Sequence, residues 1–94
     1  MAKVIVQHDV ADYDAWLPVF MEHEKVRRQY GATGHSVNRA ADNPNSLVVV
    51  NEFATLDGAR GFTQDPSVPG VMAKAGVVGH AQIWITDGGE SRAY

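Results

Sequence analysis

The chain contains no cysteine, and this absence excludes several functions at once. Without cysteine there is no disulfide framework, no thiolate nucleophile and no cysteine-ligated zinc site. No apolar run approaches the ~20 residues that cross a bilayer. The first residues enter a strand pattern at once and show no signal-peptide organisation. We therefore expect a cytoplasmic protein without a membrane partner.

Basic residues are scarce as well. Eight lysines and arginines stand against 11 aspartates and glutamates, for a net charge of −3. This balance repels a phosphate backbone, and no basic patch is interleaved with aromatic residues, so no nucleic-acid partner is expected. The phosphate-binding, dinucleotide-binding and nucleophile-elbow motifs are also missing. The sequence thus predicts a protein without a nucleotide or flavin cofactor.

With 94 residues, the chain is long enough for one domain, which we place at residues 1–87. A domain of this size buries only roughly 60–65% of its unfolded surface and gains stability from association. Residues 88–94 carry no apolar pattern and are expected to form a flexible C-terminal tail.

Hydrophobic periodicity predicts the elements of the first half. Alternating residues predict a strand over 3–9, and Asp12 suits a helix cap. Because Pro18 fits only near the start of a helix, residues 12–17 are expected to form an opening turn before the main helix. Gly31 should end that helix.

The second half repeats the alternation of helix and strand. The expected elements are a strand over 34–41, a turn over 42–45, a strand over 47–53, a helix over 56–62 capped by Thr55, a second helical piece begun by Asp65 and Pro66, and a strand over 77–86. The strand over 47–53 is apolar on both faces, which predicts a central position in the sheet.

The resulting β-α-β-β-α-β order predicts an α+β, ferredoxin-like fold. In this fold a four-stranded antiparallel sheet carries its helices on one face. The second face is expected to be apolar too, because Ile5, Val48 and Val50 point away from the helix side. An open apolar face of this kind is not left in water, so we predict a face-to-face homodimer with Trp84 at the interface.

Several stretches carry a family resemblance. These are Val10 to Trp16, Phe20 to His23, Glu52 to Phe62 and Ala75 to Gly79. Together they resemble the dimeric α/β-barrel superfamily, which includes antibiotic biosynthesis monooxygenases, haem-degrading monooxygenases, muconolactone isomerases and proteins labelled cyclases. The resemblance implies a homodimer whose sheets form a barrel, with a pocket between the helices and the sheet of each subunit.

One departure from the family's sequence pattern argues against the haem-degrading branch. Haem-degrading relatives hold iron with a histidine on the helix before the last strand. The matching residues 71–74 include Met72 but no histidine, and a buried methionine usually fills a gap in a core. The resemblance therefore implies a protein of the cofactor-independent type.

Histidines are the residue type that suggests chemistry, because imidazole exchanges protons near pH ~6.5 without large tuning. His8 shares a face with Val4 and Val6, and His23 lies on a helical stripe with Trp16, Phe20, Arg27 and Tyr30. We predict His8 and His23 as the catalytic pair, facing one cavity. Structural roles for both are the alternative, and a metal held by His8, His23 and His35 is a further one; no usual ligand spacing supports a metal.

Other residues are candidates for binding a substrate. Asn51 interrupts an apolar strand, so its amide must bond a neighbouring group or a substrate carbonyl. The remaining predicted binding residues are His35, Trp16, Phe20, Phe62 and Met72. Arg27 and Arg39 suit a carboxylate or phenolate, but solvated salt bridges are the favoured interpretation.

Two functions from different classes remain. The favoured one is a small-molecule enzyme of the cofactor-independent monooxygenase, cyclase or isomerase type, which acts on an apolar, oxygenated, aromatic or polyketide-like substrate through histidine acid–base chemistry. The alternative is a homodimer that binds a small ligand without catalysis.

Overall fold

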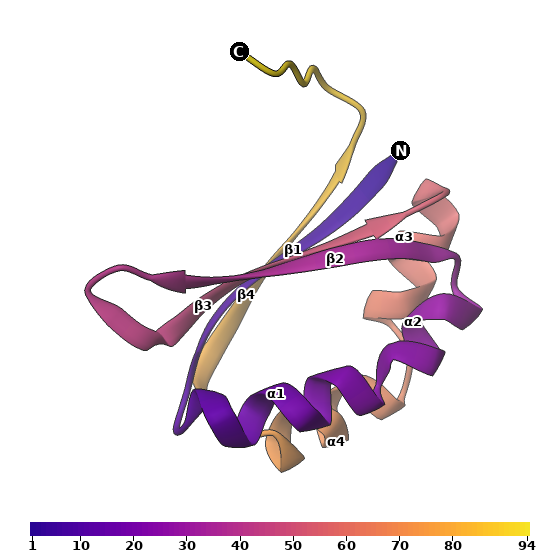
Figure 1. Ribbon diagram of the computed structural model, residues 1–94. Coiled ribbons are helices and arrows are strands. Elements are labelled where there is room, and N and C mark those ends of the chain that lie inside the picture. The colour runs from indigo at the N-terminus through magenta and orange to yellow at the C-terminus, as the bar shows by residue number, and fades with distance from the viewer.

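Four strands and four helices make up the fold in this computed structural model, which describes residues 1–94 (Figure 1). In chain order the elements are β1 (Ala2–Val10), α1 (Tyr13–Glu22), α2 (Glu24–Gln29), β2 (Ala32–Ala40), β3 (Asn43–Phe53), α3 (Leu56–Thr63), α4 (Ser67–Lys74) and β4 (Val77–Asp87). None of the helices has the length and apolar character needed to cross a membrane.

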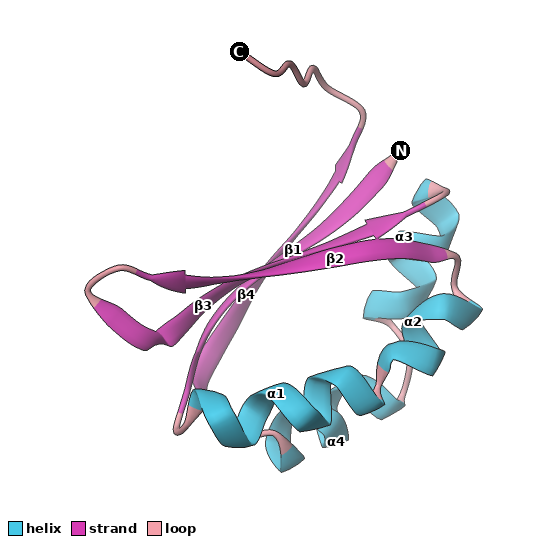
Figure 2. Cartoon of the chain, in the orientation of Figure 1, coloured by secondary structure: helices cyan, strands magenta, loops and turns pink.

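The strands form one sheet in the order β2-β3-β1-β4, and every neighbouring pair is antiparallel. All four helices lie on one side of this sheet (Figure 2). The predicted ferredoxin-like fold class is thus confirmed. The prediction of a central position for the strand over 47–53 is also correct, because β3 lies between β2 and β1.

Alternation along the two central strands builds the core. Even-numbered residues of β1 and odd-numbered residues of β3 face the helices, and their buried apolar members are Ala2, Val4, Val6, Val10, Leu47, Val49 and Phe53. The helices cover them mainly with Trp16 and Phe62. Because side chains along a strand alternate between faces, the same alternation carries His8 and Asn51 into this layer.

The helical segment between β1 and β2 begins earlier than predicted. The Asp12 carboxylate accepts a hydrogen bond from the Asp14 amide, and α1 continues through Pro18. The opening turn predicted for residues 12–17 is therefore wrong: Asp12 already satisfies an amide at the helix start, and Pro18 removes only one bond in the second turn. The helix is interrupted at His23 instead, and Gly31, with a φ of +88°, ends α2 as predicted.

The hairpin between β2 and β3 is tighter than predicted. Ala40 pairs with Asn43, so only Ala41 and Asp42 form the turn, and the rest of the predicted turn at residues 42–45 belongs to β3. Asn43 Oδ1 accepts the Asn45 amide at 3.0 Å. This local bond shapes the start of the strand, where composition alone suggested a longer loop.

In the segment between β3 and β4, the predicted capping residues bond the helix starts. The Thr55 hydroxyl accepts the Gly58 amide at 3.0 Å, and the Asp65 carboxylate accepts the Ser67 amide at 2.9 Å at the start of α4. The last strand carries a bulge opposite His8: β1 advances from Gln7 to Asp9 while β4 runs from Gln82 to Val78.

Candidate functional site

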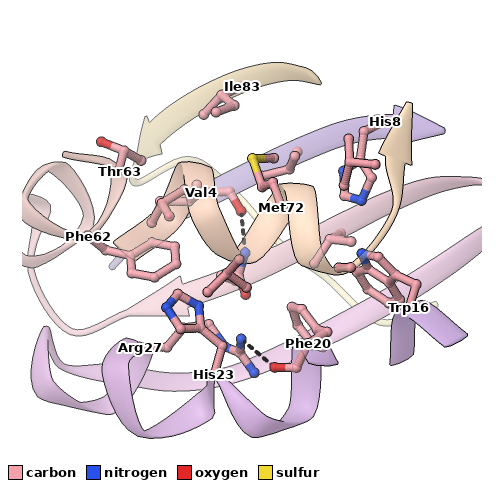
Figure 3. Close-up of a pocket in the computed structure, with 17 residues that line it drawn as sticks. Val4, His8, Trp16, Phe20, His23, Arg27, Phe62, Thr63, Met72 and Ile83 are labelled. Atoms are coloured by element: carbon pink, nitrogen blue, oxygen red, sulfur yellow. Dashed lines mark hydrogen bonds between the residues drawn. The ribbon is translucent and has the colours of Figure 1, made fainter. Parts of the chain in front are cut away.

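A cavity lies between the helices and the sheet (Figure 3). Twelve of the 17 residues that line it are hydrophobic, and the polar ones are His8, His23, Arg27, Asn51 and Thr63. The space open to the centres of water-sized molecules is about 80 Å³, whereas one buried water needs on the order of 10–15 Å³. The cavity therefore has room for several waters.

Most of the residues predicted for the site line this cavity. They are His8, His23, Asn51, Trp16, Phe20, Phe62 and Met72. His35 does not line it: it is exposed on the edge strand β2 and lies edge-on against Phe20, with ring centroids 4.9 Å apart. His35 instead borders a polar cleft with Arg28 and Thr33. His80 is exposed and also lies outside the cavity.

His8 is buried, and neither of its ring nitrogens has a hydrogen-bond partner. Its ring lies 5.7 Å from that of Trp16, measured between centroids. Burial lowers the pKa of His8 below its ordinary value, and the nearby charge of Asp9 only partly opposes this effect. The imidazole is therefore neutral at pH 7, with one nitrogen free to accept a proton and the other free to donate.

Asn51 is also buried, on β3 beside β1. Its Nδ2 donates to the carbonyl oxygen of Val4 at 3.4 Å, while its Oδ1 has no partner. Of the two partners considered from the sequence, the structure contains a neighbouring group, the Val4 carbonyl, on Nδ2; Oδ1 is an acceptor and cannot bond a substrate carbonyl. The nitrogen bonds a neighbouring strand, and the oxygen is left as an unused acceptor at the cavity.

His23 lies in the interruption between α1 and α2, at the start of a hydrogen-bonded chain. Its Nε2 is 2.9 Å from Ser67 Oγ, and the Ser67 hydroxyl donates to Asp65. Because Ser67 uses its only hydrogen on Asp65, His23 must donate from Nε2. Neutral His23 therefore carries its lone pair on Nδ1, the position of a base.

The far end of this chain is an ionised carboxylate. Tyr30 donates its hydroxyl to Asp65 Oδ2 at 2.6 Å. The bonds from Ser67 and Tyr30 lower the pKa of Asp65 to about 2. Burial and the Arg27 charge lower the pKa of His23, whereas Asp65 acts in the opposite direction.

Arg27 is the cavity residue that sequence reasoning undervalued. It is only 3% exposed, and its guanidinium lies 3.8 Å above the Phe20 ring. Nη1 donates to the Phe20 carbonyl at 2.9 Å, Nη2 has no partner, and none of the ion pairs in the structure includes Arg27. The favoured solvated salt bridge is therefore wrong. The helical stripe through Trp16, Phe20 and His23 already pointed Arg27 inward.

Arg39, the other arginine considered, does not reach the cavity. It stacks 3.8 Å above the Tyr13 ring and donates from Nε to the Pro44 carbonyl at 2.9 Å. Its role is to tie the β2–β3 hairpin to the start of α1.

The polar groups lie at two ends of the cavity. Figure 3 shows His8 beside Trp16 at one end and His23 beside Arg27 at the other. The rings of Trp16 and Phe20 stack between them, with centroids 4.8 Å apart. No three histidine, aspartate or glutamate side chains come together as metal ligands, so the metal alternative through His8, His23 and His35 lacks a converging ligand set.

No protein-family model and no curated protein matches the sequence. Solved structures, however, match the fold of this chain. An antibiotic biosynthesis monooxygenase is 20% identical, with a TM-score of 0.69 over 96% of this chain and 100% of that one. SnoaB, a cofactor-independent oxygenase from Streptomyces nogalater, is 15% identical, with a TM-score of 0.76 over 96% and 94%.

A proposed antibiotic biosynthesis monooxygenase from Bordetella bronchiseptica gives a similar result. It is 13% identical, with a TM-score of 0.75 over 95% of this chain and 97% of that chain. At such low identities the likeness concerns the fold, which hosts many functions. These matches agree with the resemblance found in the sequence, and the chain has the fold shared by structures of antibiotic biosynthesis monooxygenases.

Proposed function

We propose that the protein is a small-molecule enzyme of the cofactor-independent monooxygenase type, with His8 and His23 as its acid–base residues. The observation that carries this proposal is the set of unused polar atoms at an apolar cavity: both nitrogens of His8 and Oδ1 of Asn51. Burying such atoms without partners costs ~1–3 kcal/mol each. A ligand that bonds them recovers this cost.

The first step assigned to the site is proton removal. Neutral His8, or His23 through Nδ1, accepts a proton from a phenol or from a CH₂ group beside a carbonyl. Asn51 Oδ1 accepts a hydrogen bond from a substrate hydroxyl and fixes its position. The imidazolium that forms at His23 is supported by Asp65 through Ser67. Cyclisation and isomerisation share this step.

Oxygenation then uses the substrate itself as the reductant. The carbanion donates its electrons to dioxygen and forms a C–O bond, which gives a peroxide. Loss of the second C–H proton breaks the O–O bond and leaves a carbonyl, while the outer oxygen departs as water. The balance is CH₂ plus O₂ giving C=O plus H₂O. The description of SnoaB as a cofactor-independent oxygenase supports this choice of reaction for a protein with the same fold.

The test is turnover of hydroxylated anthrones, whose central CH₂ can undergo this oxidation, followed by oxygen uptake and absorbance. His8→Gln and His23→Gln should each lower kcat by roughly 10²–10⁴-fold, as expected for an acid–base residue, with substrate binding retained. His80→Gln is the matched control, because His80 is exposed outside the cavity. Tight binding of the substrate by the wild type without any oxygen uptake would instead support the ligand-binding alternative.

A homodimer completes the proposal. On the sheet face away from the helices, Val50, Ile5 and Trp84 form one row across β3, β1 and β4. Val48 and Trp84 are exposed there in the single chain. Packing this face against a second copy would remove the exposed apolar surface from water.

A further inference from the structure

Arg27 is the one charged group at the cavity that the proposed reaction does not use. Its guanidinium is always protonated under ordinary conditions, yet Arg27 is buried, lining both the apolar cavity and the polar cleft, and its Nη2 has no partner. A buried charge is stable only when it is paired or hydrogen-bonded. The protein supplies Arg27 with one carbonyl and one aromatic face, and the charge of Glu24 acts on it from nearby, but no carboxylate forms an ion pair with it.

The neighbouring acidic groups are already engaged. Asp65 accepts hydrogen bonds from Ser67 and Tyr30, and Glu24 lies 3.8 Å from Arg28. No aspartate or glutamate lines the cavity itself. No carboxylate of the chain therefore bonds the free Nη2 of Arg27. Burial lowers the pKa of Arg27 to about 10, and the charge of Glu24 only partly opposes this effect, which agrees with a buried cation that a bound anion would stabilise.

We propose that the cavity selects a flat ring compound with one planar oxyanion, which binds Arg27 while the ring lies along Trp16 and Phe20. A carboxylate or an enolate matches the flat fork of a guanidinium. The aromatic wall between Arg27 and His8 suits the ring. This orientation directs the far end of the ligand toward His8, so Arg27 sets both the charge and the direction of the substrate.

This inference names the substrate class of the proposed enzyme. It rests on the proposed function only in taking this cavity as the substrate site. Its test is a binding experiment that needs no turnover. Calorimetry at pH 7.5 would compare two matched pairs. The first is 2-naphthoate against neutral 2-naphthamide. The second is 2-hydroxy-1,4-naphthoquinone, an enolate at this pH, against its neutral 2-methoxy ether.

The wild type should bind the anion of each pair about tenfold or more tightly than the neutral partner, as expected for charge-assisted hydrogen bonds. Arg27→Met should abolish this preference. Arg28→Gln, one residue further on the same helix and exposed, should keep it. Because Arg27→Met removes an unpaired buried charge, the variant should melt no lower than the wild type; Arg27→Gln is a second variant should the first not fold.

Equal affinity of the wild type for both members of each pair would overturn the inference, as would an anion preference that survives in Arg27→Met or Arg27→Gln. Either result would leave acid–base catalysis by His8 and His23 standing. A retained anion preference without any turnover of the anthrones would contradict the proposed function and leave the charge selection intact.

Discussion

His8 and His23 line the same cavity, but their ring nitrogens are held in different ways. His8 has no partner at all, so its tautomer is set by whatever enters the cavity. His23 is fixed by Ser67, which in turn is fixed by Asp65. Only His23 thus has a base position defined before a ligand binds. This difference makes His23 the better organised of the two for removing a proton from a substrate.

The tautomer of His23 provides a prediction that needs no substrate. In long-range ¹H–¹⁵N NMR spectra, neutral His23 should carry its proton on Nε2, and Ser67→Ala should remove this preference. Both His8 and His23 should titrate below about 6.5, the ordinary value. Asp65→Asn should lower the pKa of His23 further, because the Asp65 charge favours the protonated ring.

The pKa of His8 serves as the internal control and should not change in Asp65→Asn, because Asp65 is not among the groups that shift it. Neutral His23 with its proton on Nδ1 would contradict the proposed direction of the Ser67 hydrogen bond.

The lowered pKa values of His8 and His23 also predict how stability depends on pH. Since both folded-state values lie below the unfolded value, the unfolded chain binds protons first, and stability should fall as the pH drops below about 6.5.

Side-chain periodicity was enough to predict that most of the candidate residues line one cavity. Alternation on β1 placed His8 inward, and the spacing from Trp16 to Phe20 and His23 placed the helix residues on the same cavity. The hydrogen-bonded groups that fix His23 could not be predicted, because Ser67 and Asp65 lie 44 and 42 positions away from His23 in the sequence. Alternation along β2 also places the His35 side chain on the helix side of the sheet. It misses the cavity because β2 is an edge strand and Phe20 stands in between.

At the scale of elements, two glycines in helices have opposite surroundings. Gly58 lies in α3, and a Cβ there would come within 2.1 Å of the Tyr30 carbonyl oxygen, where the end of α2 meets α3. Gly70 lies in α4, and a Cβ there would meet nothing within 4 Å. Close contact of two helices thus requires glycine at the first position and not at the second.

We predict that the same substitution changes stability in opposite directions at these two sites. Gly70→Ala should stabilise the fold by ~0.5–1 kcal/mol, because alanine loses less backbone entropy in a helix. Gly58→Ala should destabilise it by ~1–3 kcal/mol, because α3 must move away from Tyr30. Thermal melts of the two variants beside the wild type measure both effects. A Gly58→Ala variant as stable as Gly70→Ala would show that the α2–α3 contact yields easily.

Element boundaries show where local sequence signals fail. Pro18 suggested a helix start, but Asp12 already caps the helix, and aromatic packing by Trp16 and Phe20 holds the turn that contains the proline. The real interruption is at His23, which no helix-breaking residue marks. Its ring bonds Ser67 of α4. A tertiary contact of this kind has no local signature, whereas the caps at Thr55 and Asp65 do and were predicted correctly.

For the whole molecule, the open sheet face carries the remaining prediction. This face is less uniformly apolar than the sequence suggested, because Gln7 and Gln82 pair across β1 and β4 next to the row that contains Ile5 and Trp84. The apolar row still leaves Trp84 48% exposed in a single chain. A tryptophan buries some 150–250 Å² when it is covered, so we expect Trp84 to be the strongest single contributor to the proposed association.

Light scattering coupled to size exclusion, at micromolar concentration, should therefore give about twice the mass of one chain. Trp84→Glu should convert the protein to a monomer, because a carboxylate cannot be desolvated in an apolar interface without a partner. Met21→Glu is the matched control: Met21 is an apolar residue of similar exposure, 44%, but it lies on α1 on the helix side of the sheet. This variant should remain a dimer. A stable, monodisperse wild-type monomer would contradict the proposed association, and a Trp84→Glu dimer would place the interface on another face.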